Sequence, residues 1–184
     1  MGQFPEIERI QQGWYFGIEG PDGSGKTTVS KRLREITGIP VFHRHPPIFG
    51  YDPKISMGME WAALKLYKEL GFSIIEERTF LGFDIYRNNQ YYTPKIREEF
   101  IHLVTSGGKY LYVFLKVDND VLRKRLAEQG EEVPNVDIDN AKYEDFFDRI
   151  RLSDVDYREM NMIQVDANGL VDDICFSILQ GIKI

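Results

Sequence analysis

Residues 20–27 read Gly-Pro-Asp-Gly-Ser-Gly-Lys-Thr and match the whole of the phosphate-binding pattern G-x-x-x-x-G-K-[ST]. The glycines let the backbone curl, so that successive N–H groups can point inward at phosphate oxygens. Lys26 would reach the β- and γ-phosphates of a nucleoside triphosphate, and the Thr27 hydroxyl would bind the Mg²⁺ that bridges them. The other residues assigned to this loop are Gly20, Asp22, Gly23, Ser24, Gly25 and Thr28.

The sequence on either side of the loop predicts a strand before it and a helix after it. Residues 14–18 (Trp-Tyr-Phe-Gly-Ile) form a short aromatic run that favours a strand. Val29, Leu33 and Ile36 fall on one face of a helix. A helix that starts at the loop adds the positive end of its dipole to the anion site. We therefore interpret residues 20–27 as a site for ATP and Mg²⁺, in preference to a glycine-rich turn that binds nothing.

The composition is that of one globular domain of 184 residues, with 42% hydrophobic and 28% charged residues. The net charge of −6 argues against broad binding to nucleic acid, which depends on neutralising many phosphates. Cys175 is the only cysteine and cannot form an internal disulfide, which fits a reducing compartment. No stretch is long and apolar enough to span a membrane. We expect a soluble cytoplasmic protein.

Short apolar strands alternate with helices along the chain, which is typical of a parallel sheet covered on both faces. The fold expected is α/β: a P-loop NTPase-type, three-layer α/β/α sandwich with a five-stranded parallel sheet and a short lid. Residues 1–13 are interpreted as a lead-in and residues 14–184 as the nucleotide-binding domain. The predicted strands are 14–18, 40–43, 72–75, 110–117 and 162–165. The predicted helices are 26–36, 56–70, 81–91, 94–106, 119–129, 141–157 and 170–182, with an acidic loop at 130–140.

Charged residues follow the predicted strands at the edge of the sheet where such folds bind ligands. Glu77 and Arg78 come at the end of a central strand, and Arg44 follows the second strand. Arg78 can donate two N–H bonds to a phosphate, and Glu77 could order Mg²⁺ and its waters or accept a proton from the acceptor. The alternative is a surface Glu-Arg pair that ends a strand.

Two clusters on predicted helices could read a nucleobase. Trp61 and Lys65 are four residues apart, so they share a helix face on which a ring could stack on a base while an ammonium binds its edge. An ordinary core role for Trp61 has equal weight, because aromatics at helical spacing usually pack inside. Tyr86, Arg87 and Gln90 form the second cluster.

These segments together resemble the thymidylate kinases, a family of P-loop nucleoside monophosphate kinases, over nearly the whole chain from residue 14. The most specific part is residues 18–28 (IEGPDGSGKTT), which look like that family's E-G-x-D-G-x-G-K-T-T signature. Shorter segments are similar to further motifs of the family: residues 43–46 (HRHP) to R-E-P, 61–65 (WAALK) to F-A-A-x-R, 77–79 (ERT) to D-R-Y, 86–87 (YR) to Tyr-Gln, 147–151 (FDRIR) to the F-x-x-V-R helix, and 166–167 (DA) to the adenine loop.

The resemblance implies phosphoryl transfer from Mg²⁺-ATP to a deoxynucleoside monophosphate such as dTMP, and it implies a homodimer. It further implies that Asp22 holds the sugar of the acceptor and that Arg44 and Arg78 bind its phosphate. The remaining assignments are the base of the acceptor to Trp61, Lys65, Tyr86 and Arg87, and the adenine of ATP to Asp166 and Ala167.

The chain departs from the family in the lid, at about residues 129–141. The family's lid carries arginines that close over the ATP phosphates, whereas residues 129–132 here read Gln-Gly-Glu-Glu. An acidic lid would repel the triphosphate, so the charge of the transition state would be met by Arg125, Arg149 or Arg151. Glu77 replaces an aspartate and Arg87 a glutamine, so the base specificity does not transfer.

Other functions stay open at this stage. Residues 77–79 also resemble the E-R-S motif of deoxynucleoside kinases, so the acceptor could be a nucleoside. A kinase that acts on DNA is disfavoured by the acidic balance. A nucleotide-dependent switch without catalysis would suit the acidic lid, but it has little need of an acceptor-side arginine such as Arg78.

Overall fold

The computed structural model describes residues 10, 12–43, 53–86, 93–107, 109–130, 135–152 and 161–182. The strands are β1 (Tyr15–Glu19), β2 (Val41–His43), β3 (Ile74–Glu77), β4 (Tyr110–Lys116) and β5 (Met162–Asp166). The helices are α2 (Lys26–Thr37), α3 (Pro53–Glu69), α4 (Leu81–Tyr86), α5 (Pro94–Thr105), α6 (Asn119–Glu128), α7 (Val136–Leu152) and α8 (Val171–Gln180). None of these helices has the length and apolar character needed to cross a bilayer.

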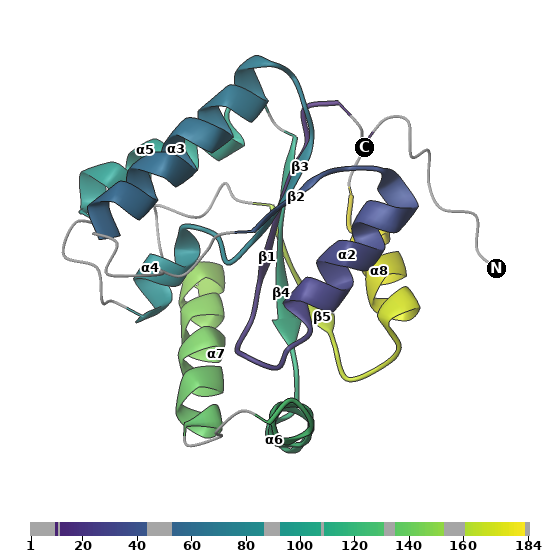
Figure 1. Cartoon of the computed structure of the whole chain (residues 1–184). Coiled ribbons are helices and arrows are strands. Elements are labelled where there is room, and N and C mark those ends of the chain that lie inside the picture. The colour runs from purple at the N-terminus through teal and green to yellow at the C-terminus, as the bar shows by residue number, and fades with distance from the viewer. Residues whose placement is uncertain are drawn as a thin grey trace.

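All five strands run parallel in one sheet, in the order β2-β3-β1-β4-β5. From the central strand β1 the chain builds one side of the sheet with β2 and β3, and then the other side with β4 and β5 (Figure 1). The carboxyl end of β1 therefore lies where the direction of winding reverses. Open α/β sheets bind their ligands at this point, and residues 20–27 follow β1 directly.

Strand β4 shows how the sheet holds two cores. Successive side chains of a strand point to opposite faces. Leu111 and Leu115 pack in the cluster that contains residues of α2 and α8, whereas Tyr112 and Phe114 pack in the cluster of α3, α5 and α7. Figure 1 shows the same division, with α2 and α8 on one side of the sheet and α3, α4, α5 and α7 on the other. The predicted three-layer α/β/α fold is confirmed.

Each predicted strand and helix has a counterpart, and the largest shift is at the start of α7. This helix begins at Val136, not at Ala141, so the second half of the predicted 130–140 loop is helical. Asp137 accepts a hydrogen bond from Asn119 Nδ2 at 2.6 Å, which ties the first turn of α7 to α6. Carboxylates in a first turn also interact favourably with the helix dipole. The acidic residues that indicated a loop therefore begin the helix.

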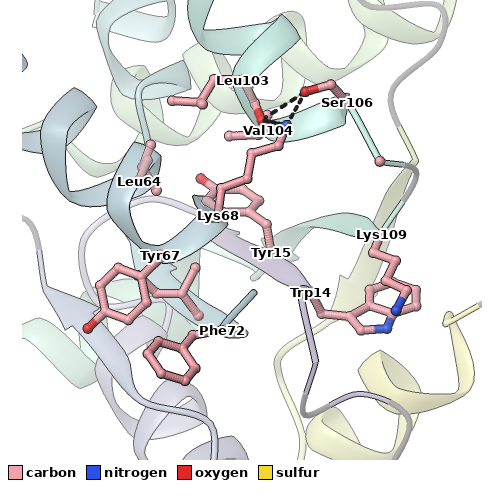
Figure 2. A pocket seen from close by; sticks show the side chains of 13 residues that line it. Trp14, Tyr15, Leu64, Tyr67, Lys68, Phe72, Leu103, Val104, Ser106 and Lys109 are labelled. Atoms are coloured by element: carbon pink, nitrogen blue, oxygen red, sulfur yellow. Dashed lines mark hydrogen bonds between the residues drawn. The ribbon is translucent and has the colours of Figure 1, made fainter. Parts of the chain in front are cut away.

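A hollow at the amino ends of the strands lies opposite the phosphate-binding loop (Figure 2). Its lining includes Trp14, Leu64, Tyr67, Lys68, Phe72 and Lys109. Lys68 Nζ donates to Leu103 O at 2.6 Å, and Lys109 Nζ donates to Gln12 O at 3.2 Å. Both ammonium groups thus contact backbone carbonyls, which is a structural role.

Candidate active site

The loop between β1 and α2 has a backbone that requires glycine. Gly25 has φ 89° immediately before α2, in the left-handed region that side chains disfavour. A Cβ on Gly20 would lie 2.7 Å from Ser24 Oγ and 3.0 Å from Leu115 O. The loop therefore curls tightly onto the end of β4 and enters α2 at its positive N-terminus, where backbone N–H groups favour an anion. These features fit a triphosphate.

Lys26 extends back across this loop. Its Nζ donates to Gly20 O at 2.6 Å and to Pro21 O at 2.7 Å, and the residue is only 6% exposed. Burial, together with the nearby guanidinium of Arg78, lowers the pKa of the ammonium to about 8. A negatively charged ligand would relieve this cost, because it supplies the counter-charge that solvent does not.

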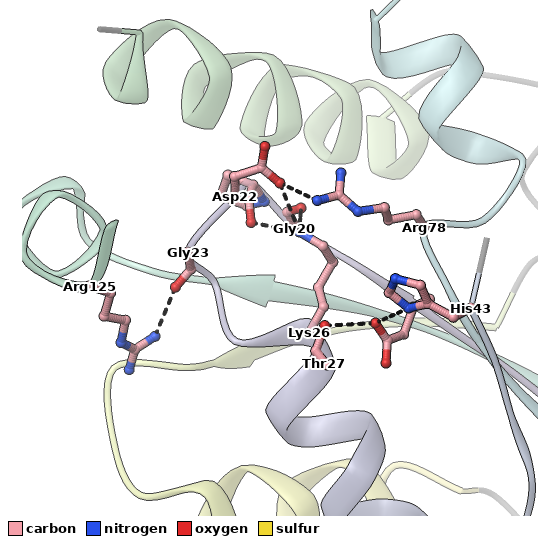
Figure 3. Close-up of polar contacts among 10 residues, drawn as sticks. Gly20, Asp22, Gly23, Lys26, Thr27, His43, Arg78 and Arg125 are labelled. Carbon is pink, nitrogen blue, oxygen red and sulfur yellow. Dashed lines mark hydrogen bonds and ion pairs between the residues drawn. The ribbon is translucent and has the colours of Figure 1, made fainter. Parts of the chain in front are cut away.

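Asp22 and Arg78 form an ion pair across the loop, with Arg78 Nη2 2.6 Å from Asp22 Oδ1 (Figure 3). Lys26 Nζ lies 3.7 Å from the same oxygen. Partial burial acts to raise the pKa of Asp22, but Lys26 and Arg78 outweigh it and the pKa is lowered. Two cations from different elements thus converge on one carboxylate, which occupies a position suited to an anion.

Arg78 itself has an unusual backbone. Its φ is 59°, and it is the one non-glycine residue with positive φ in the part of the chain that the structure describes. Its N–H donates to Ile18 O at 3.2 Å, which holds the turn against the end of β1. A non-glycine residue in this region costs of order 1–3 kcal/mol and is found preferentially at functional sites. The unusual backbone conformation at Arg78 sets the direction of its side chain, so that the guanidinium reaches the loop.

Glu77 is almost fully buried, and two side chains contact its Oε2 (Figure 3). Thr27 Oγ1 donates to it at 2.9 Å, and His43 Nδ1 lies 2.8 Å from it. The structure thus brings the two predicted metal ligands, Thr27 and Glu77, together. A Mg²⁺ held with a nucleotide needs only one or two protein oxygens, because phosphates and waters supply the other ligands. The donor set therefore fits Mg²⁺.

Arg125 joins the phosphate-binding loop to the segment predicted to hold adenine. Its Nη2 donates to Ala167 O at 2.9 Å, and its Nη1 lies 3.5 Å from Gly23 O. Asp166 shapes that segment, since its Oδ1 accepts the N–H of Asn168 at 2.9 Å. Arg125 is therefore close to both predicted ends of a bound nucleotide. Its role in place of the family's lid arginines stays a prediction.

The predicted base-reading pair on α3 is arranged less favourably. The ring of Trp61 packs edge-on against Phe100, with centroids 5.1 Å apart, and the residue is partly buried. Lys65 is exposed, and its Nζ lies 3.8 Å from Oε1 of Glu69 on the same helix. Their contact with a base stays a prediction. Other predicted side chains lie outside what the structure describes: Arg44, Tyr86, Arg87, Arg149 and Arg151, together with Glu131 and Glu132 of the predicted lid.

Two polar residues of the site were not assigned a role from sequence. His43 contacts Glu77, and Glu19 lies buried at the end of β1, where its Oε1 accepts a hydrogen bond from Thr79 Oγ1 at 2.9 Å. A carboxylate at the end of an apolar strand is a signal that could have found Glu19. His43 could not be found in this way, because its contact depends on the pairing of β2 with β3.

No protein-family model matches the sequence, and no curated protein matches it. Solved structures do share its fold. The YorR protein from Bacillus subtilis in complex with phosphorylated GDP superposes with a TM-score of 0.68 at 16% identity, over 89% of this chain and 91% of that chain. Deoxyadenosine kinase from M. mycoides with bound dATP gives 0.61 at 19% identity, over 91% and 97%. A gluconokinase from Sinorhizobium meliloti 1021 gives 0.56 at 18% identity, over 93% and 92%.

These neighbours include kinases of different substrates, and at such identities the likeness concerns the fold alone. The chain thus shares the fold of these proteins.

Proposed function

We propose that this protein is an ATP- and Mg²⁺-dependent kinase that transfers the γ-phosphoryl group to a deoxynucleoside 5′-monophosphate and yields the diphosphate. The observation that carries this proposal is the meeting of Lys26 and Arg78 at Asp22. Lys26 belongs to the donor side, because it lies in the phosphate-binding loop. Arg78 comes from the end of β3 and belongs to the acceptor side. A phosphoryl group in transit would lie between these two cations.

The donor side would hold ATP by its phosphates. The loop and the N-terminus of α2 offer N–H groups to the phosphate oxygens, and Lys26 offers a desolvated ammonium. Thr27 and Glu77 would hold Mg²⁺, which would offset the negative charge of the phosphates. Arg125 would steady the far end of the nucleotide through its contact with Ala167.

The acceptor side would use Arg78 to bind the phosphate that receives the new group. A guanidinium can donate two parallel N–H bonds to a phosphate, which both orients the acceptor and offsets charge that develops during transfer. Its present partner, Asp22, would turn to a hydroxyl of the sugar, as the resemblance to thymidylate kinases implies. Arg44, Trp61, Lys65, Tyr86 and Arg87 complete the proposed acceptor site, and a homodimer remains the expectation from the same resemblance.

A deoxynucleoside kinase is the second candidate, and a specific feature favours it. Residues 77–79 read Glu-Arg-Thr, and a deoxyadenosine kinase is among the proteins that share the fold. In that case Arg78 would contact the transferring phosphoryl group itself, and the acceptor hydroxyl would need a base nearby. The two candidates thus differ in whether the acceptor already carries a phosphate.

The test is ADP release from Mg²⁺-ATP with each deoxynucleoside monophosphate, each deoxynucleoside and single-stranded DNA in separate reactions. Stimulation by one or two monophosphates is the expected result. Stimulation by nucleosides or DNA would keep the donor chemistry but overturn the acceptor. Lys26→Ala should abolish transfer without unfolding the chain, whereas Lys31→Ala, on the exposed face of α2, should not. Tight ATP binding with no turnover in any reaction would favour a switch.

A further inference from the structure

His43 is set beside Glu77 by the pairing of two strands. His43 and Glu77 are Cα partners in the parallel register of β2 and β3. Neighbouring strands lie about 4.8 Å apart, so paired side chains on the same face are in contact range. The resulting distance between His43 Nδ1 and Glu77 Oε2 is 2.8 Å. The backbone of the sheet, and not a loop, therefore fixes this contact.

The contact orients a carboxylate that is otherwise poorly solvated. Glu77 is 2% exposed, so water can do little to hold its side chain in one rotamer. Thr27 and His43 approach the same atom, Oε2, from α2 and β2 respectively. Two groups on one oxygen restrict the orientation of the carboxylate and leave Oε1 outside both contacts. A carboxylate held in this way is prepared for a cation before the cation arrives.

We propose that His43 is a positioning residue for metal binding: through the 2.8 Å contact of its Nδ1 with Glu77 Oε2 it orients the carboxylate that, with Thr27, takes the Mg²⁺ of the bound nucleotide. This inference rests on the proposed function, because it assumes that nucleotide and metal bind at the loop. It goes further in naming a residue that does not touch the metal. The proposal assigns this effect to the N–H donor at Nδ1 and not to the packing of the imidazole ring.

Two substitutions separate the hydrogen bond from the packing of the ring. His43→Phe keeps a planar ring of similar size and removes the donor. His43→Asn removes the ring and keeps an N–H donor near the position of Nδ1. The matched control is His102→Phe on the exposed face of α5, far from the phosphate-binding loop in the sequence and on another element. Thermal unfolding of each variant shows whether the fold is kept.

The measurement is the affinity of Mn²⁺ for the complex of the protein with ADP, from the electron paramagnetic resonance signal of free Mn²⁺. ADP binding in EDTA is measured alongside it. His43→Phe should weaken Mn²⁺ binding by about 10-fold or more, as expected for loss of an outer-shell partner of a metal ligand. Metal-free ADP binding should be unchanged. His43→Asn and His102→Phe should remain close to the wild type.

Each outcome bears on the inference. Wild-type Mn²⁺ affinity in His43→Phe would overturn it, and so would equal losses in His43→Phe and His43→Asn, because the ring rather than the donor would then matter. Should His43→Phe fail to fold, His43→Ala serves as the variant without a donor, with the same expected loss. Failure of the wild type to bind ADP at all would overturn the proposed function itself. If the wild type binds ADP but its complex with ADP shows no added affinity for Mn²⁺, only the metal inference would be overturned.

Discussion

The buried ammonium of Lys26 predicts an unusual dependence of stability on pH. Lys26 is 6% exposed and its pKa falls from 10.5 to about 8, first because of burial and then because of Arg78. As pH rises above 8, the folded chain releases this proton while the unfolded chain still holds it. The unfolded state then binds more protons, so the free energy of unfolding rises with pH until about pH 10.5.

The size of the effect follows from the two pKa values. Between pH 7 and pH 9, linkage predicts that Lys26 contributes a gain of about 1.3 kcal/mol to the stability of the folded chain. The perturbation that isolates it is Lys26→Met, which keeps a long apolar stem and removes the titrating group. The free energy of unfolding of the wild type minus that of the variant should be larger at pH 9 than at pH 7 by this amount.

Urea unfolding of both proteins without nucleotide, at pH 7 and at pH 9, measures that difference. Lys31→Met, on the exposed face of the same helix, controls for the loss of a lysine as such. A wild-type-minus-variant difference that does not change with pH would refute the reasoning. It would mean that the ammonium is adequately hydrated in the folded chain, and that its two carbonyl contacts carry no desolvation cost.

Four further predictions test other parts of the structure. Gly17→Ala places a Cβ 2.6 Å from ring carbons of Tyr112, and should lower the free energy of unfolding by about 2–3 kcal/mol. Gly58→Ala, whose Cβ meets nothing within 4 Å, should raise it by about 0.5–1 kcal/mol in the same urea titration. Burial raises the pKa of Cys175 to about 12, so a thiol reagent at pH 8 should label it only after unfolding; rapid labelling of the folded chain would contradict this. Asp22→Ala should bind metal-free ATP several-fold more tightly by calorimetry in EDTA, because it removes a carboxylate from beside Lys26 and Arg78; weaker binding would show that Asp22 instead orders the loop.

The sequence predicts the donor half of the site well because that half is local. Residues 20–27 are contiguous. Their pattern predicts both the conformation of the backbone and the two side chains that would contact the ligand, Lys26 and Thr27. The ends of the strands at Glu77 and Arg78 could also be predicted, since the alternation of strands and helices brings carboxyl ends to one edge. The distance of 2.9 Å between Thr27 and Glu77 agrees with this reasoning.

Contacts that depend on register or on rotamers could not be predicted in this way. The contact between His43 and Glu77 could be predicted only from the residue-by-residue pairing of β2 with β3. The start of α7 was misplaced because Asp137 and Asp139 suit both an acidic loop and a first helical turn, and only the packing of Asp137 on Asn119 decides between them. Trp61 could have stacked on a base or in the core, and its contact with Phe100 depends on a neighbouring helix.

Asp22 lies between two cations of the site and offsets their repulsion. Lys26 and Arg78 would repel each other across the loop, and the burial of Lys26 adds to the cost of this repulsion. The Asp22 carboxylate, 2.6 Å from Arg78 and 3.7 Å from Lys26, offsets it. On the proposed function, a phosphate bound by Lys26 and Arg78 would displace this contact, and part of its binding free energy would be used to release Asp22. The released carboxylate would then be available to the proposed acceptor, which would couple occupancy of the two proposed sides.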